Sequence, residues 1–380
     1  MKILFVLENY LPHIGGVEIV FKNLSEGLVK LGHEVSIVTH RIKGTKRFEI
    51  IRGVKIHRVD CFNSRYWFTF LSIPTIINLV KEFDIIHTTS FNGAPPAWLV
   101  SKITRKKCMI TIHEVWINKW DKLTKMGWIN CKIHNILEQF IYLLNFDRYV
   151  CVSKSTQHQL ICHGISKDKT SVIYNGVDYE HWKPENYNGK QIREELKLEN
   201  NFVYLFSGRP GISKGLEYLI KAVNSISERI PNSKLLAIVS NDKTYEKRYK
   251  YIISLIKKLK LDDKVILLNP VSYKNLPSYL KAADCVVVPS LAEGFGFAVA
   301  EACVMDIPVV ASNTTSIPEV ISGKYILVKP KSTKELVEGI IKVFNHEFKI
   351  TPLKKFKIDE NITNYLREYQ KLFKKNAGEN

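Results

Sequence analysis

Short, apolar, β-branched runs alternate with longer segments of helical spacing along most of the chain, and this alternation restricts the fold more than any other feature. Runs such as Ile3–Leu7, Val35–Thr39 and Met109–Ile112 are apolar without strict alternation, as in strands covered on both faces. Between them, segments such as Val17–Leu31 carry apolar residues at helical intervals. Strands that alternate with helices form parallel sheets with right-handed crossovers. We therefore expect an α/β fold.

The alternation pauses at a polar stretch, Asp178–Leu196, and then restarts with a new strand at Phe202–Phe206. Because 380 residues are many for one domain, we expect two Rossmann-like, doubly wound parallel-sheet domains. The expected boundaries are residues 1–185 for the N-terminal domain and 186–357 for the C-terminal domain. A last amphipathic segment, 358–380, is free to pack back on the N-terminal domain.

The chain is strongly basic. Its 56 Lys and Arg residues exceed the 37 Asp and Glu residues, which gives a formal net charge of +19. Such an excess indicates either an anionic partner or a lysine-rich proteome, and the sequence leaves both open. The densest clusters, Arg41–Arg58 and Lys102–Lys107, lie in the N-terminal half. No nucleic-acid-binding module is recognisable, so we expect no nucleic-acid partner.

The compartment is expected to be the cytoplasm. The first apolar run stops at Glu8, too early for a signal peptide, and the seven cysteines include no CxxC pair that would indicate a zinc site. The longest uncharged stretch, Tyr66–Val80, is shorter than the roughly 20 residues of a spanning helix. It is expected either to be buried or to lie on the inner face of an anionic membrane as a peripheral contact.

Loops that follow strands are the places to search for a site, because ligands of parallel sheets bind beyond the carboxyl ends of the strands. Gly15 and Gly16 lie at the start of the first expected helix, where backbone N–H groups attract anions. The loop Ser207–Gly215 follows the first strand of the second half and offers Arg209 and Lys214. A guanidinium and an ammonium group together suit a diphosphate.

A third loop, Pro289–Glu301, combines a glycine-rich turn with two carboxylates, Glu293 and Glu301. Carboxylates accept hydrogen bonds from sugar hydroxyls, and the N–H groups of the turn suit a phosphate. The turn residues are Gly294, Phe295, Gly296 and Phe297. His113 ends another strand and completes the candidate set. Each of these signals also fits a purely structural role.

Several other chemistries find no sequence support. The chain has no GxxxxGK[ST] phosphate loop, no GxSxG nucleophile elbow and no DxD pair for a divalent metal. We therefore expect neither a metal nor a cofactor.

Taken together, the loops resemble the family 4 retaining glycosyltransferases (glycosyl transferases group 1) of the GT-B fold. The similarity runs through PHIGGVE near the N-terminus, VSKST, IYNGVD, SGRPGISKG, AADCVVVPS, the E-x7-E run from Glu293 to Glu301, and IPVVAS. The number and order of these segments make the match specific over nearly the whole chain. The resemblance implies two domains that face each other across a cleft, with a C-terminal helix that crosses back to the first.

The resemblance also implies an activity: transfer of a hexose-type sugar from a UDP- or GDP-sugar to a lipid-linked or other glycan acceptor, with retention of configuration. Arg209 and Lys214 would contact the donor diphosphate, Glu293 the transferred sugar and Glu301 the ribose. Gly16 would lie near the distal phosphate and His113 beside the sugar. Two alternatives remain open, a nucleotide-sugar epimerase of the same fold and a non-catalytic nucleotide-sugar-binding subunit.

Overall fold

The computed structural model describes residues 1–13, 15–62 and 64–374. Ile14, which belongs to the first glycine loop, and the last six residues of the expected terminal segment lie outside the described residues. Backbone contacts divide the chain into two compact units. The first comprises residues 1–118, 128–176 and 356–380, and the second comprises 119–127 and 177–355.

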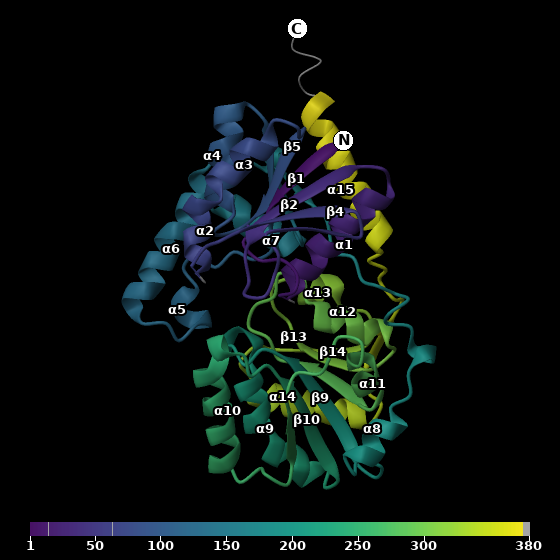
Figure 1. Cartoon of the computed structure of the whole chain (residues 1–380). Helices are drawn as coiled ribbons and strands as arrows, with labels where there is room; N and C mark the ends of the chain where they lie inside the picture. The colour runs from purple at the N-terminus through teal and green to yellow at the C-terminus, as the bar shows by residue number, and fades with distance from the viewer. Residues whose placement is uncertain (14, 63, 375–380) are drawn as a thin grey trace. The chain divides into compact units, whose positions relative to one another are not determined.

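The first unit is built on an eight-stranded sheet (Figure 1). Its strand order is β3-β4-β2-β1-β5-β6-β7-β8, and all pairs are parallel except β3 with β4. The strands are β1 (Lys2–Val6), β2 (Glu34–His40), β3 (Phe48–Ile51), β4 (Val54–Val59), β5 (Ile85–Thr89), β6 (Lys107–Ile112), β7 (Arg148–Cys151) and β8 (Thr170–Val172).

Successive side chains of a strand point to opposite faces, so this sheet buries two separate cores. Leu4 and Val6 pack into one core, whereas Ile3 and Phe5 pack into the other. The first core is covered by α2 (Arg65–Leu71), α3 (Ile73–Val80), α4 (Ala94–Thr104), α6 (Trp128–Leu143) and α7 (Lys154–Cys162). The second is covered by α1 (Gly16–Lys30) and α15 (Ile358–Lys374).

The C-terminal helix α15 packs beside α1 on the first unit, as expected (Figure 1). Arg148 on β7 forms an ion pair with Glu368 on α15. The hydroxyl of Tyr369 lies 2.6 Å from Nδ1 of His87, and that of Tyr365 lies 3.1 Å from Oγ1 of Thr111. The end of the chain is therefore an integral part of the N-terminal core.

The second unit has a seven-stranded sheet of order β11-β10-β9-β12-β13-β14-β15, parallel except for β14 with β15. The strands are β9 (Phe202–Gly208), β10 (Ser233–Val239), β11 (Val265–Leu268), β12 (Cys285–Val288), β13 (Val309–Ser312), β14 (Gly323–Val328) and β15 (Lys349–Thr351). The helices are α5 (Trp120–Leu123), α8 (Lys190–Glu195), α9 (Leu216–Arg229), α10 (Glu246–Lys258), α11 (Leu276–Lys281), α12 (Phe297–Val304), α13 (Ile317–Val320) and α14 (Thr333–Phe344).

The expectation of two Rossmann-like α/β sheets is therefore confirmed. The antiparallel edge strands β3 and β15 were not expected; they are short, and neither is a continuous apolar run. The assignment of residues 1–185 to the acceptor side and of residues 186–357 to the donor side stays a prediction.

The structure also shows the burial of the cysteines and the character of the apolar helices. Six of the seven cysteines are buried, and Cys162 is exposed. Among the described helices, none qualifies as a membrane-spanning segment.

Candidate functional site

The loop after β9 carries both expected phosphate-binding cations. A one-turn 3-10 helix, Ile212–Lys214, follows Arg209, and Gly215 then adopts φ +68° before α9 begins. A Cβ atom on Gly215 would lie 1.9 Å from the carbonyl oxygen of Pro289, so only glycine fits here. This close approach fixes the β9 loop against the loop after β12.

Lys214 and Glu293, 79 residues apart in sequence, form an ion pair across these two loops. The Lys214 ammonium donates to both carboxylate oxygens of Glu293, at 2.7 and 2.9 Å. The side chains are only 22% and 9% exposed, so solvent screens the pair weakly. The exposed Arg209 donates to the Tyr245 hydroxyl at 3.0 Å. The loop thus presents one cation that is already neutralised and one that faces solvent.

Three hydroxyl residues hold Glu293 in place, and the sequence analysis did not single them out. Ser290 donates to a Glu293 carboxylate oxygen at 2.7 Å. The backbone N–H of Glu293 donates to Thr315 at 2.9 Å, and Ser316 donates to the Glu293 carbonyl oxygen at 3.0 Å. Thr315 and Ser316 follow β13. Their position just after a strand was the one sequence feature that could have marked them as site residues.

The glycine-rich turn leads directly into α12. Gly296 precedes the helix with φ +95°, and Phe295 and Phe297 on either side place their ring centroids 5.1 Å apart. No side chain caps the first turn of α12 among the described residues. Its first backbone N–H groups lack intrahelical acceptors, as at any helix start, and suit an anion or a hydroxyl oxygen.

Glu301 lies in the second turn of α12 and has an unusual protonation equilibrium. The residue is half-buried, and burial raises the pKa of its carboxyl group to about 8. Tyr273 lies close enough for the Glu301 charge to add to the burial that raises the pKa of its hydroxyl. This shift favours the protonated carboxyl group near neutral pH.

In the first unit, the loop after β1 leads into α1. Gly15 caps this helix in an extended conformation without a side-chain hydrogen bond, and Gly16 is its first residue. The buried carboxylate of Glu18 lies over the first turn, 3.1 Å from Nδ1 of His13. A Cβ atom on Gly15 would meet that carboxylate at 2.5 Å. A side chain at position 15 would therefore displace the Glu18 carboxylate.

His113 follows β6 on the same edge of the sheet, where its ring contacts Phe21 of α1 at 6.0 Å between centroids. Burial lowers the pKa of the imidazole to about 4, and Glu18 opposes this only in part. Its Nε2 atom is buried and has no hydrogen-bond partner within the described part of the chain. A buried, neutral imidazole nitrogen without a partner suits a hydroxyl group of a ligand.

In both sheets a candidate loop follows the strand at which the strand order reverses: Gly15 and Gly16 come after β1, and Arg209 and Lys214 come after β9. β1 lies between β2 and β5, and β9 lies between β10 and β12. Such switch points are where parallel sheets bind ligands. The first unit holds one group of expected site residues (Gly15, Gly16 and His113), and the second holds the other (Arg209, Lys214, Glu293, Gly294, Phe295, Gly296, Phe297 and Glu301).

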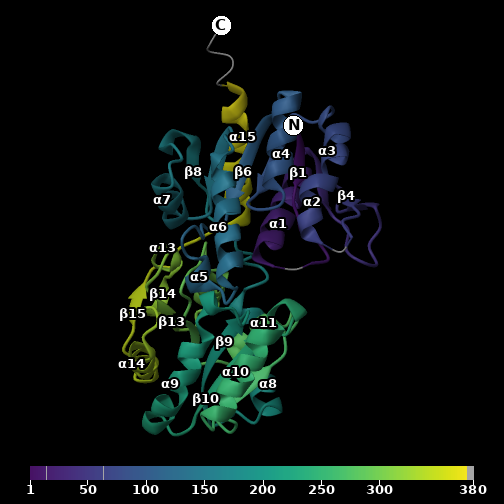
Figure 2. The ribbon, with the colours of Figure 1, turned by 90° about the vertical axis from the view of Figure 1, so that its left-hand side faces the viewer.

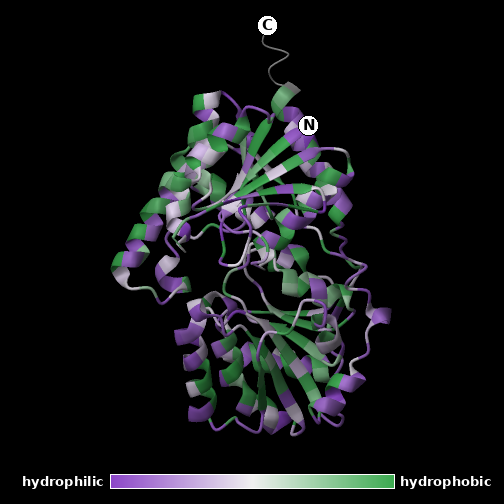
Figure 3. Cartoon of the chain, viewed as in Figure 1, coloured by the Kyte–Doolittle hydropathy of each residue, from purple (hydrophilic) through white to green (hydrophobic). Residues whose placement is uncertain are grey.

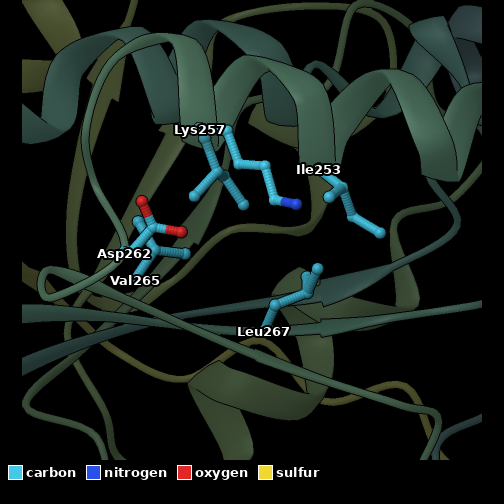
Figure 4. Close-up of a pocket in the computed structure, with 6 residues that line it drawn as sticks. Ile253, Lys257, Asp262, Val265 and Leu267 are labelled. Carbon is cyan, nitrogen blue, oxygen red and sulfur yellow. The ribbon is translucent and has the colours of Figure 1, made fainter.

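Two further observations concern other kinds of site. The pocket in Figure 4 lies against α10 and β11 and contains none of the expected site residues; it is lined by Ile253, Ile256, Lys257, Asp262, Val265 and Leu267. Within the described residues, no group of His, Cys, Asp or Glu is arranged as a metal site.

Comparison with known proteins identifies the family. Residues 14–181 match the model of Glycosyltransferase Family 4, and residues 188–367 match that of glycosyl transferases group 1. An uncharacterized glycosyltransferase of Methanocaldococcus jannaschii is 30% identical over 368 residues, which cover 91% of this chain and 89% of that protein. The phosphatidylinositol N-acetylglucosaminyltransferase GPI3 subunit of Saccharomyces cerevisiae is 25% identical over 90% of this chain and 75% of its own length.

Solved structures support the fold. A sucrose-phosphate synthase from Thermosynechococcus elongatus superposes with a TM-score of 0.80 at 20% identity over 98% of both chains. Anabaena HepE, solved in complex with UDP and glucose, superposes with a TM-score of 0.74 at 19% identity over 100% of both chains. The chain therefore belongs to the family 4 retaining glycosyltransferases of the GT-B fold, which use nucleotide-sugar donors.

Proposed function

We propose that this protein transfers a hexose-type sugar from a UDP- or GDP-sugar to a lipid-linked glycan acceptor. The observation that carries the proposal is the Lys214–Glu293 ion pair beside Arg209, at the switch point of the second sheet. A donor joins an anionic diphosphate to a sugar rich in hydroxyl groups. A neighbouring cation and carboxylate match these two parts.

In this proposal each expected residue has one role. Arg209 and Lys214 bind the diphosphate, and the N–H groups at Gly15–Gly16 and Gly294–Phe297 bind phosphate or hydroxyl oxygens. Glu293 and His113 bind the transferred sugar, and Glu301 binds the ribose. The buried Nε2 atom of His113 and the raised pKa of Glu301 support these roles, because both groups gain a partner when hydroxyls arrive.

The chemistry follows from charge development. As the bond between the anomeric carbon and the phosphate oxygen breaks, the sugar becomes oxocarbenium-like and negative charge builds on the leaving diphosphate. Arg209 and Lys214 stabilise that charge from fixed positions, which is usually the largest contribution to catalysis. For retention, the acceptor hydroxyl attacks from the side that the phosphate leaves, and the leaving oxygen takes its proton.

The choice of a lipid-linked acceptor rests on the names of two relatives and on the charge of the chain. The yeast relative is named as a phosphatidylinositol N-acetylglucosaminyltransferase, and a Homo sapiens protein named for the same transferase is 24% identical over 90% of this chain and 68% of its own length. The basic charge of +19 suits a phosphate-bearing acceptor at a membrane surface. We therefore place the reaction on the cytoplasmic side of a membrane, with the protein bound peripherally.

A two-step experiment tests the proposal. The purified chain is screened by thermal shift against nucleotide sugars, where a ligand at a hundredfold excess over its Kd adds about 2.7 kcal/mol of stability. The donor that binds is then incubated with phosphatidylinositol or polyprenyl phosphate in detergent micelles. We expect product only with an acceptor, with the anomeric configuration of the donor retained by NMR. Donor isomerisation without acceptor would indicate an epimerase, and binding without turnover a non-catalytic subunit.

A further inference from the structure

The helix α6 exposes an apolar surface on the side opposite its core contacts. Cys131, Glu138, Ile141 and Tyr142 are buried. Six other large apolar side chains at helical spacing form a stripe about 120° wide, centred opposite the buried face at 100° per residue. We call these residues the α6 stripe: Ile129, Ile133, Ile136, Leu137, Phe140 and Leu143, between 47% and 80% exposed.

Neighbouring helices extend this surface. The helices α2, α3, α4 and α6 pack their inner sides on the same core of the first unit, so their outer sides face the same way. Figure 2 shows α6, α4 and α2 side by side on this face, and Figure 3 shows the hydrophobic positions along α6. The exposed aromatic side chains of α2 are Tyr66, Trp67 and Phe70, and Ile103 of α4 is 62% exposed.

The exposed charged side chains of these helices are positive. The sequences of α2, α3, α4 and α6 contain a single acidic residue, Glu138, which is buried and accepts hydrogen bonds from Trp116 and Tyr142. Lys102 and Lys132 are exposed on the same helices, and the Lys132 ammonium lies 3.9 Å from the ring centroid of Trp128. These four helices therefore combine exposed apolar and aromatic side chains with lysines and contribute no exposed carboxylate of their own.

The basic cluster Arg41–Arg58, in contrast, is partly engaged in ion pairs within the protein. Arg41 and Arg47 both pair with Asp60, and Lys55 pairs with Glu34. Arg58 is buried, pairs with Glu49 and donates to the carbonyl oxygen of Leu11 at 2.8 Å. Five of the seven cations of this cluster, Arg41, Arg47, Arg52, Lys55 and Arg58, thus contact carboxylates within the protein. The helical face instead joins its lysines to exposed apolar side chains on three helices, and this combination suits an anionic lipid surface.

We propose that the outer face of α2, α4 and α6 binds the surface of an anionic lipid bilayer. Apolar side chains enter the boundary between headgroups and acyl chains, aromatic rings lie at headgroup depth, and the lysines contact lipid phosphates. A second copy of the chain is a poorer partner, because it would bring lysines of the same sign together. The inference deepens the proposed lipid-linked acceptor, although the binding itself needs no catalysis.

Vesicle flotation of the full chain tests this inference. We expect binding to vesicles of equimolar phosphatidylglycerol and phosphatidylcholine, weaker binding to phosphatidylcholine alone, and release at high salt. The variant I133S/I136S/F140S should bind the anionic vesicles at least about tenfold more weakly, because it loses three insertable side chains. The matched control is L31S, whose side chain is 57% exposed at the end of α1 on the other face of the sheet.

The results of these measurements distinguish membrane binding from sugar transfer. The triple variant should keep the thermal unfolding and the UDP or GDP binding of the parent, since the three side chains are exposed. Failure of the parent to bind anionic vesicles at low salt, or equal binding by the variant, would overturn the inference. A dimer in sedimentation that the triple variant disrupts would also overturn it, as a protein interface. Vesicle binding without any sugar transfer would count against the proposed function alone.

Discussion

At the scale of single residues, the Lys214–Glu293 ion pair joins the two residues to which we assign the diphosphate and the sugar of the donor. Before a donor binds, the ammonium neutralises a carboxylate that is only 9% exposed. Removal of either partner therefore leaves the other without its charge partner in a poorly solvated place, which costs roughly 1–3 kcal/mol. The proposed roles therefore couple stability and catalysis at this position.

The pair yields a prediction in which these two effects separate. K214Q should lower kcat by about 10²–10³-fold, because the leaving diphosphate loses a fixed cation. It should also lower the free energy of unfolding, measured in denaturant. The double variant K214Q/E293Q should recover most of that stability but no activity. Recovery of turnover in the double variant would show that Lys214 serves only to balance Glu293.

A second residue-scale prediction concerns Glu301, whose pKa burial raises to about 8. If ribose hydroxyls donate to the ionised carboxylate, the free protein must lose a proton to bind. Below pH 8, nucleotide affinity should then rise with pH by up to about tenfold per unit. Calorimetry of UDP and GDP binding between about pH 6 and 9 measures this. In E301Q this pH dependence of nucleotide affinity should vanish. If the variant keeps the pH profile of the parent, Glu301 does not bind the ribose as a carboxylate.

The same shift has a defined sign for stability. The unfolded carboxyl, with the ordinary value of 4.5, ionises before the folded one. Between about pH 4.5 and 8 the folded state therefore binds the extra proton, and the Glu301 contribution to stability falls as the pH rises.

At the scale of elements, Gly215 allows the loop after β9 to lie close to the loop after β12. The Gly215 backbone approaches Pro289, and α9 starts immediately afterwards. G215A should separate the two loops, weaken nucleotide binding and lower the melting temperature. The matched control is G323A in the same unit, which has φ +70° but no atom within 4 Å of the added Cβ. It should cost only the backbone strain of about 1 kcal/mol. Equal effects of the two changes would show that the contact is unimportant.

At the scale of the whole molecule, the proposed mechanism takes the charges that stabilise the leaving group from the chain itself. Arg209, Lys214 and the N-terminus of α12 are positive, and the sequence contains no DxD pair. We therefore predict that sugar transfer persists after exhaustive chelation with EDTA. Loss of activity on chelation, restored by magnesium or manganese, would contradict this prediction.

Much of the fold could be predicted from the sequence because it depends on local patterns. Runs such as Phe202–Phe206 and the helical spacing of 358–374 predict buried strands and an amphipathic helix without reference to distant residues. The family assignment, carried by the order of several motifs, is confirmed. The roles of Arg209, Lys214, Glu293, Glu301 and His113 stay predictions, to be tested by the variants above.

The sequence by itself determined the class of fold, the order of its elements and the strand-end loops that carry candidate residues. Only the tertiary structure decided which charges meet. Lys214 pairs with Glu293, Arg41 with Asp60 and Lys55 with Glu34, because the folded chain brings together residues far apart in sequence. The same holds for α6. Its sequence carries apolar residues on both sides, and only packing against the sheet decides which side is left exposed.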